Sequence, residues 1–219
     1  MKTPSPLLFF LPYAVVFLFH VSCCAAGKQP ARRATKTLLM PLLMLGYTFA
    51  AAKPAAAVYL ALLFGWLGDL LLLRPRVKFR QLGGIAAFLI GHCFYISVLL
   101  RRISACGHLR LIWLPPLVFL LLAAGICVFQ YPVVEKRMVL PGLVYYLFLA
   151  ALGAFSGIAL LGGTPRGWAY LCGSLLFLCS DSVLCRQFFT VGSPAPKYDF
   201  TVMLTYTLAQ FFLVFGFCA

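Results

Sequence analysis

The chain consists of long apolar runs separated by short polar connections. The runs approach the roughly 20 residues that a helix needs to cross a bilayer, and eight can be distinguished. The pattern predicts an all-α protein, a polytopic integral membrane bundle of eight transmembrane helices in one domain covering residues 1–219. The expected spans are 7–26, 37–52, 55–73, 83–100, 111–129, 138–161, 168–186 and 200–218.

The first run resembles a signal peptide, because "VSCCAAG" (21–27) has the small residues of a cleavage site. Its flank, however, carries only Lys2 as a basic residue, and Pro12, Tyr13 and His20 interrupt its apolar core. We therefore expect it to be retained as a span.

Charge is scarce and mostly positive. Only 10% of the residues are charged, against about 25% in a typical soluble domain, yet the formal net charge is +14. Binding of nucleic acid would need a basic face on a soluble module, and the short connections contain no such module. We expect the basic excess to set topology and to contact membrane lipid headgroups.

The distribution of Lys and Arg predicts the topology. Eight spans put both termini on one side, and 12 of the 18 basic residues follow odd-numbered spans. By the positive-inside rule these connections face the cytoplasm, so both termini lie on the non-cytoplasmic side of a bacterial inner membrane or the endoplasmic reticulum. The twelve are Lys28, Arg32, Arg33, Lys36, Arg74, Arg76, Lys78, Arg80, Lys136, Arg137, Arg186 and Lys197.

Two spacings occur in both halves of the chain. A Lys precedes a Pro by five residues at the opening of a span, and an Asp precedes an Arg by five residues near the end of a span. The pairs are Lys36 with Pro41, Lys136 with Pro141, Asp69 with Arg74, and Asp181 with Arg186. A four-plus-four duplication explains this, and so does coincidence.

Two of the four acidic residues lie inside predicted spans. Glu135 and Asp199 fall in connections, whereas Asp69 and Asp181 each lie about one and a half helical turns from a basic residue and so at similar depth. An ionised Asp inside a span costs about 2.5–3.5 kcal/mol. Either the pair forms a functional site, or each Asp binds a nearby Arg or Lys and holds the bundle together.

Further polar side chains gather in the same spans. Tyr206 and Gln210 share a helix face at i and i+4, Tyr95 follows His92 by three residues, and Ser180 is placed to donate to Asp181. His92 also fits a structural role, satisfied by a neighbouring hydroxyl or carbonyl. Neither an H-x-x-H spacing for zinc nor a G-x-S-x-G nucleophile elbow is present, so we expect no metal and no cofactor. The expected orienting residues are His92, Tyr95, Tyr145, Ser180, Tyr206 and Gln210.

Several motifs together resemble the YhhN-type lysoplasmalogenases, the bacterial relatives of the vertebrate transmembrane lysoplasmalogenase. The resemblance covers nearly the whole chain and departs at Thr37, where the family usually has Pro. It implies hydrolysis of the vinyl ether bond of lysoplasmalogens to a fatty aldehyde and glycerophosphocholine or glycerophosphoethanolamine, with Asp69 and Asp181 as catalytic residues. The motifs are "KTLLMPLL" (36–43), "GWLGDLLLL" (65–73), "FLIGHCFYI" (88–96), "MVLPGLVYY" (138–146), "GSLLFLCSDSVL" (173–184) and "TYTLAQFF" (205–212).

The chemistry of a vinyl ether suits two buried carboxyl groups. Hydrolysis begins with protonation of the β-carbon, which gives an oxocarbenium ion that water then attacks. Burial favours the neutral acid that protonates carbon, and a nearby ionised carboxylate stabilises the cation, as in glycosidases. The sequence does not assign the two roles between Asp69 and Asp181. Lys36 is placed to meet a substrate phosphate at the membrane surface.

Two other classes of function remain open from the sequence. A proton-coupled transporter of small molecules or lipids uses intramembrane acids and often an internal duplication, and a structural or lipid-binding membrane protein uses them for packing. Transport requires a proton gradient, whereas hydrolysis persists in detergent. The expected partners are a lysophospholipid substrate and membrane lipids, without nucleic acid, and no sequence feature specifies an oligomeric state.

Overall fold

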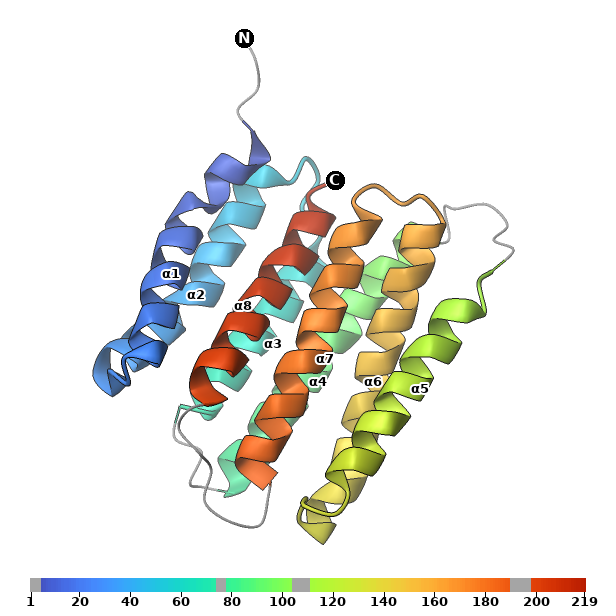
Figure 1. The fold of residues 1–219 in the computed structure, drawn as a ribbon. Helices are drawn as coiled ribbons and strands as arrows, with labels where there is room; N and C mark the ends of the chain where they lie inside the picture. Colours follow the sequence, from blue (N-terminus) through green and yellow to red (C-terminus); the bar gives the residue numbers. More distant parts are fainter. Residues whose placement is uncertain (1–4, 74–77, 104–110, 190–197) are drawn as a thin grey trace.

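The computed structural model describes residues 5–73, 78–103, 111–189 and 198–219, and every element in these ranges is a helix (Figure 1). This confirms the prediction of an all-α membrane bundle. The elements are η1 (Pro6–Phe10), α1 (Leu11–Ala25), α2 (Gln29–Ala50), α3 (Ala56–Leu71), α4 (Lys78–Ile103), α5 (Leu114–Gln130), α6 (Lys136–Leu161), α7 (Gly167–Phe189) and α8 (Tyr198–Phe217).

In the described part of the chain, five helical segments are long and apolar enough to cross a membrane, namely η1 with α1, α4, α6, α7 and α8. Helices α3 and α5 are apolar but shorter. The chain is therefore a multi-pass membrane protein. The eight individual crossings with their boundaries, the host membrane and the side on which the termini lie remain predictions.

Six helices form a closed ring. In order around it, α2 contacts α3, α3 contacts α4, α4 contacts α6, α6 contacts α7, α7 contacts α8, and α8 returns to α2 and α3. Helix α1 packs outside on α2 and α8, and α5 packs outside on α6 (Figure 1). The ring brings the end of the chain beside its beginning, so that helices far apart in sequence can build one interior.

Helices α1 to α4 and helices α5 to α8 have a similar pattern of helix–helix contacts. The sequential contacts of α1 to α4 match those of α5 to α8, as expected for any series of helical hairpins. A contact between non-sequential helices is more telling, because α4 against α6 has its counterpart in α8 against α2. This pattern favours the four-plus-four duplication and gives Asp69 on α3 and Asp181 on α7 equivalent places.

Several helices extend beyond the apolar runs that predicted them. Helix α2 begins at Gln29 rather than at residue 37, with Pro30 in its first turn, where Pro fits well. Arg32, Arg33 and Lys36 therefore belong to a helix and not to a connection, because Arg, Lys and Ala are good helix formers. The same correction applies to Lys78, Arg80, Lys136, Arg137 and Arg186, whereas Arg74, Arg76 and Lys197 lie outside the described residues.

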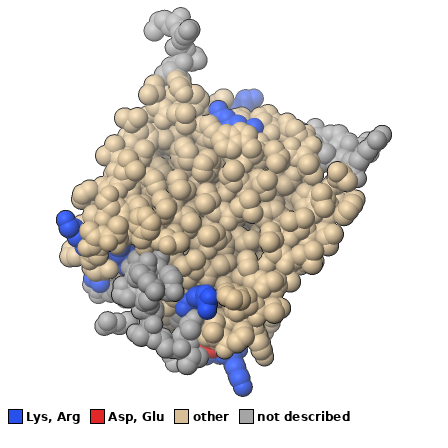
Figure 2. All heavy atoms as spheres, in the orientation of Figure 1, with Lys and Arg blue, Asp and Glu red and all other residues tan. Residues whose placement is uncertain are grey.

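The outer surface is apolar between its two ends. Figure 2 shows Lys and Arg of the visible face near the ends of the bundle, with uncharged side chains between them. Large apolar side chains such as Leu18, Leu121 and Leu147 are more than half exposed. An apolar surface of this extent suits lipid contact rather than water.

Two glycines make a matched test of helix packing. A Cβ at Gly153 on α6 would overlap the Phe119 ring of α5, whereas a Cβ at Gly125 on α5 meets nothing within 4 Å. We expect Gly153→Ala to destabilise the protein by about 1–3 kcal/mol through overpacking. Gly125→Ala should stabilise it by up to about 1 kcal/mol through helix propensity. Thermal unfolding in detergent measures both, and equal shifts for the two variants would contradict this packing.

Candidate active site

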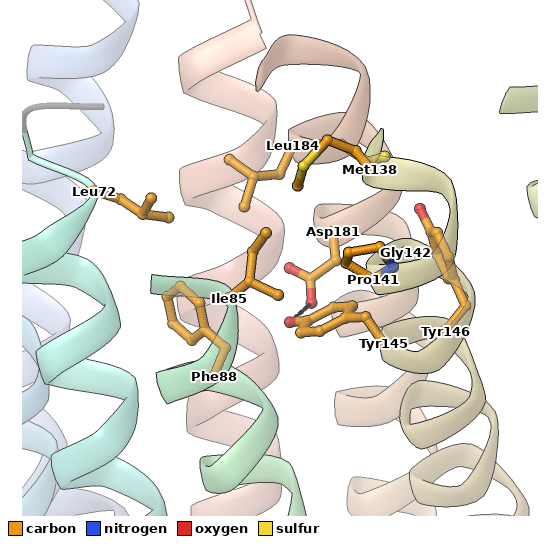
Figure 3. A pocket seen from close by; sticks show the side chains of 11 residues that line it. Leu72, Ile85, Phe88, Met138, Pro141, Gly142, Tyr145, Tyr146, Asp181 and Leu184 are labelled. Atoms are coloured by element: carbon orange, nitrogen blue, oxygen red, sulfur yellow. Dashed lines mark hydrogen bonds between the residues drawn. The ribbon is translucent and has the colours of Figure 1, made fainter. Parts of the chain in front are cut away.

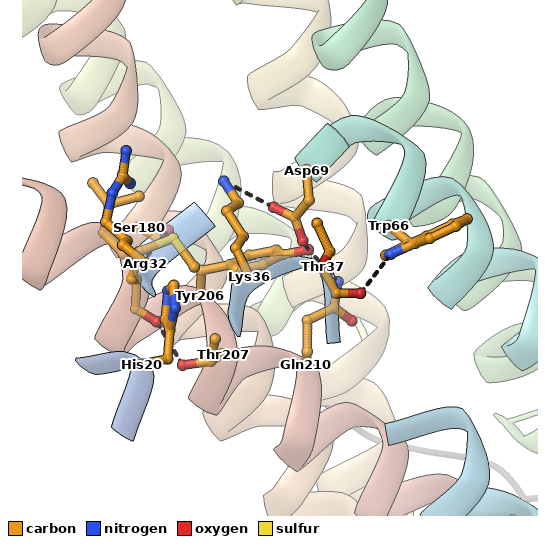
Figure 4. A network of polar contacts seen from close by, with 12 residues as sticks. His20, Arg32, Lys36, Thr37, Trp66, Asp69, Ser180, Tyr206, Thr207 and Gln210 are labelled. Atoms are coloured by element: carbon orange, nitrogen blue, oxygen red, sulfur yellow. Dashed lines mark hydrogen bonds and ion pairs between the residues drawn. The ribbon is translucent and has the colours of Figure 1, made fainter. Parts of the chain in front are cut away.

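Asp69 on α3 is buried and has partners on both carboxylate oxygens. The Lys36 ammonium of α2 lies 3.1 Å from Oδ1, and the Tyr206 hydroxyl of α8 donates to Oδ2 at 2.9 Å (Figure 4). Lys36 is only 8% exposed. The structure places Lys36 inside the bundle, because α2 begins early, and its expected contact with a substrate phosphate stays a prediction.

A proline in α2 helps to align Lys36 with Asp69. Pro41 has no N–H, so the carbonyl of Thr37, four residues earlier, lacks its usual helical donor. The Trp66 indole of α3 donates to that carbonyl at 2.8 Å. Trp66 lies one turn before Asp69, and Thr37 follows Lys36. This hydrogen bond therefore holds the two helices in the register that the ion pair needs.

A chain of hydrogen bonds extends from Asp69 across the ring. The Gln210 amide donates to the Tyr206 hydroxyl at 3.3 Å, and the Tyr95 hydroxyl of α4 donates to Gln210 Oε1 at 2.6 Å. Gly65 leaves room for this chain, since a Cβ there would lie 3.0 Å from Gln210 Nε2. The structure thus brings five predicted site residues, Lys36, Asp69, Tyr95, Tyr206 and Gln210, into one network.

Asp181 on α7 has a different environment. It is 8% exposed, and the Tyr145 hydroxyl of α6 donates to its Oδ2 at 2.6 Å (Figure 3). Among the described residues no basic side chain forms an ion pair with it. Arg186, five residues later, lies over the Phe129 ring instead. Asp181 is thus held by a neutral donor and Asp69 by a cation.

Ser180 does not support Asp181 as expected. Its hydroxyl donates to the main-chain carbonyl of Val202 on α8 at 3.2 Å. Adjacent residues on a helix point about 100° apart, so Ser180 faces α8 while Asp181 faces α6. Ser180 therefore serves the α7–α8 contact.

His92 on α4 lies beside the Asp181 cluster. Its ring packs edge-on against Phe177 and Tyr145, with centroids 4.9 and 5.7 Å away. The side chain is 2% exposed, and its Nδ1 has no hydrogen-bonding partner in the described part of the chain. A buried polar atom without a partner is costly and calls for an explanation.

Aromatic rings separate the two aspartates. Phe88 and Phe177 both pack edge-on against Tyr206, the donor to Asp69, with centroids 5.7 and 5.8 Å away. Phe177 also touches His92. Among the described residues, no hydrogen bond joins the groups around Asp69 to those around Asp181.

A cavity of about 50 Å³ opens beside Asp181 (Figure 3). Figure 3 shows the carboxyl group of Asp181 between Ile85 and Phe88 on one side and Pro141 and Tyr145 on the other. Asp181 is the one acidic side chain among the described residues that line it. A reacting group in this cavity would meet one acid in apolar surroundings.

Sequence reasoning missed three site residues. Trp66, Phe88 and Phe177 look like ordinary apolar residues of a membrane helix, although Trp66 lies inside the same motif as Asp69. A further signal was available in Gln130, an amide in an apolar run, which is buried and donates to the Tyr146 hydroxyl at 3.0 Å. Within the described ranges, no three His, Cys, Asp or Glu side chains gather in a way that could hold a metal ion.

Comparison with known proteins is consistent with the motifs. The YhhN family model matches residues 31–217. Two curated relatives named lysoplasmalogenase, from Mycobacterium bovis and Mycobacterium tuberculosis, are each 26% identical over 190 residues, which cover 86% of this chain and 70% of theirs. No solved structure matches significantly. These matches confirm the resemblance that the motifs indicated.

The Lys36–Asp69 ion pair can be tested by stability. Removing one partner of a buried pair leaves an uncompensated charge and typically costs about 3–5 kcal/mol. We expect Lys36→Met to lower the free energy of unfolding by this order, and the double variant Lys36→Met with Asp69→Asn to recover much of the loss. Unfolding in detergent measures the coupling. Additive losses would show that the pair contributes little.

Proposed function

Because this chain belongs to the YhhN family, we propose that it is a membrane-embedded hydrolase that cleaves the vinyl ether bond of lysoplasmalogens. The products are a fatty aldehyde and glycerophosphocholine or glycerophosphoethanolamine. The names of its mycobacterial relatives support this substrate class. The observation that carries the mechanism is the unequal environment of two buried aspartates, one beside a cation and one beside a neutral phenol.

We assign the acid to Asp181. A carboxyl group in apolar surroundings without a cation keeps its proton more readily than one paired with an ammonium group. Asp181 has that environment, and it lines the cavity. Tyr145 fixes the carboxyl orientation through Oδ2, which leaves the other oxygen to carry the proton. Geometry and protonation state thus favour the same residue.

Asp181 begins the reaction by giving its proton to the β-carbon of the vinyl ether. The π electrons form the new C–H bond, and the α-carbon and ether oxygen share the positive charge of the oxocarbenium ion. Water adds to the α-carbon and returns a proton to Asp181. The resulting hemiacetal then breaks its bond to the glycerol oxygen, which takes the hydroxyl proton, and releases the aldehyde.

Asp69 supplies negative charge without taking part in proton transfer. Lys36 keeps it ionised, and Tyr206 and Gln210 fix its position. A fixed carboxylate behind the aromatic rings stabilises the developing cation in a low-dielectric interior. The ring of Phe88, which lines the cavity, adds cation–π stabilisation when the charged carbon approaches it. The mechanism requires no metal or cofactor.

His92 is suited to orient the water. Its Nδ1 is buried and unpartnered in the described part of the chain, and its ring touches Tyr145 and so lies beside the acid. Neutral imidazole offers one donor and one acceptor nitrogen. A water bound at Nδ1 would satisfy that atom and stand beside the carbon that Asp181 activates.

Aldehyde release tests the function. Purified protein in detergent should release fatty aldehyde from a lysoplasmalogen. Asp181→Asn should lower the rate by roughly a hundredfold or more, the range for loss of one acid–base group. Asp69→Asn should lower it by roughly a hundredfold because it removes the charge that stabilises the cation. Glu135→Gln is the matched control, because Glu135 forms its ion pair with Arg137 at the start of α6, outside the site.

Two outcomes would contradict the proposal. A wild-type protein that folds but releases no aldehyde would exclude the hydrolase. Proton-coupled transport, which the family match does not favour, would then be the leading alternative. Equal loss in Glu135→Gln would attribute the effect to folding rather than to the carboxyl pair.

The role of His92 is separable from that of Asp181 by isotope exchange. In deuterated buffer, wild-type protein should leave unreacted substrate unlabelled, because water captures the cation before it loses a proton. His92→Phe should slow this capture, so that the cation returns to substrate and the β-carbon gains deuterium. Mass spectrometry of recovered substrate measures the exchange. Slower turnover without deuterium in the substrate would mean that His92 acts only through packing.

A further inference from the structure

A second and larger cavity lies beside the one that contains Asp181. Its volume is about 290 Å³, close to the lower end of the roughly 300–1,000 Å³ of small-molecule sites. It lies between the end of α5 and the first turns of α6, with Cys185 of α7 at its inner side. Residues of the outermost helix, such as Val128, are largely exposed there, so the cavity faces the lipid.

The two cavities are adjacent and share part of their lining. Met138, Gly142, Tyr146 and Cys185 line both of them. Three of these four residues come from one face of α6, at positions i, i+4 and i+8. A molecule that reaches from one cavity to the other therefore passes along this face of α6.

The chemistry of the larger cavity suits a hydrocarbon chain. No Lys, Arg, Asp or Glu is among the described residues that line it, and its walls include Val128, Val134, Met138, Val139 and Leu143. A phosphate would be left without a counter-charge at this place, which is costly in apolar surroundings. A methylene chain instead exchanges lipid for a similar environment.

We propose that this cavity binds the part of the substrate hydrocarbon chain that follows the vinyl ether, while the vinyl ether itself lies at Asp181. The hydrocarbon chain of the substrate enters sideways from the bilayer between α5 and α6. This inference rests on the proposed function and extends it, because it names the part of the lipid bound at a separate site. It makes the α5–α6 cavity a determinant of chain-length preference.

Gly142 at the junction allows a sharp test. A Cβ at Gly142 meets nothing within 4 Å, so a larger side chain fills cavity space without displacing protein atoms. Gly125 on α5 is equally open, is exposed, and lines neither cavity, which makes Gly125→Leu the matched control. Both substitutions replace a helical glycine by the same good helix former.

The first measurement compares lysoplasmalogens with a long and a short alkenyl chain. Gly142→Leu should lower kcat/KM for the long chain by roughly tenfold or more, because the leucine side chain occupies the path of the hydrocarbon chain and displaces the vinyl ether from Asp181. It should lower the short-chain value by a clearly smaller factor, because Gly142 also lines the cavity that contains Asp181, and Gly125→Leu should change neither. Equal loss for both chain lengths, or a loss that follows headgroup size, would overturn the proposal by placing the headgroup in the cavity.

The second measurement does not depend on turnover. An alkyl-ether lysophospholipid with a diazirine in its chain should label peptides containing residues 127–131 and 138–146 in the wild-type protein. Labelling of these peptides should fall in Gly142→Leu and persist in Gly125→Leu. Labelling that is spread equally over the lipid-facing helices in all three proteins would contradict binding of the hydrocarbon chain in this cavity. That result would stand even if the hydrolase activity is established.

Discussion

The ion pair between Lys36 and Asp69 is the interaction on which the arrangement of this bundle depends. A lone carboxylate among apolar helices is unstable, and an ammonium group beside it removes that cost only when both groups are fixed and fully bonded. The chain meets this condition by continuing α2 through its basic segment, so that Lys36 lies inside the bundle. Trp66 then holds α3 in register through the carbonyl that Pro41 leaves free.

The two halves of the bundle place similar residues in equivalent positions and use them differently. Lys136 occupies the place of Lys36 in the repeated spacing, yet it begins α6, and no ion pair joins it to Asp181 in the described part of the chain. Tyr145, about two and a half turns further along α6, donates to Asp181 instead. This single difference produces one charged and one neutral environment, which is the separation of roles that acid catalysis beside a cation needs.

The length of the apolar runs was sufficient to predict the helical class, because every span must cross the bilayer as a helix of about 20 mostly apolar residues. Asp69 and Asp181 stood out for the same reason, since each interrupts an apolar run, and both are buried in the structure. Helix α2 begins eight residues before the predicted span, because hydropathy reports where a helix is apolar, not where it begins. The predicted hydrogen bond from Ser180 to Asp181 is absent because neighbouring residues on a helix point to different partners. Contacts such as Phe88 with Tyr206 join distant segments, and no local pattern encodes them.

The proposed mechanism requires that the two aspartates differ in protonation, with Asp181 neutral and Asp69 ionised. Infrared spectroscopy measures this directly, because the C=O stretch of a protonated carboxyl group is separate from the bands of a carboxylate. The wild-type protein near neutral pH should show one buried protonated carboxyl band. That band should disappear in Asp181→Asn and remain in Asp69→Asn. Loss of the band in Asp69→Asn, with retention in Asp181→Asn, would reverse the assignment and contradict the account.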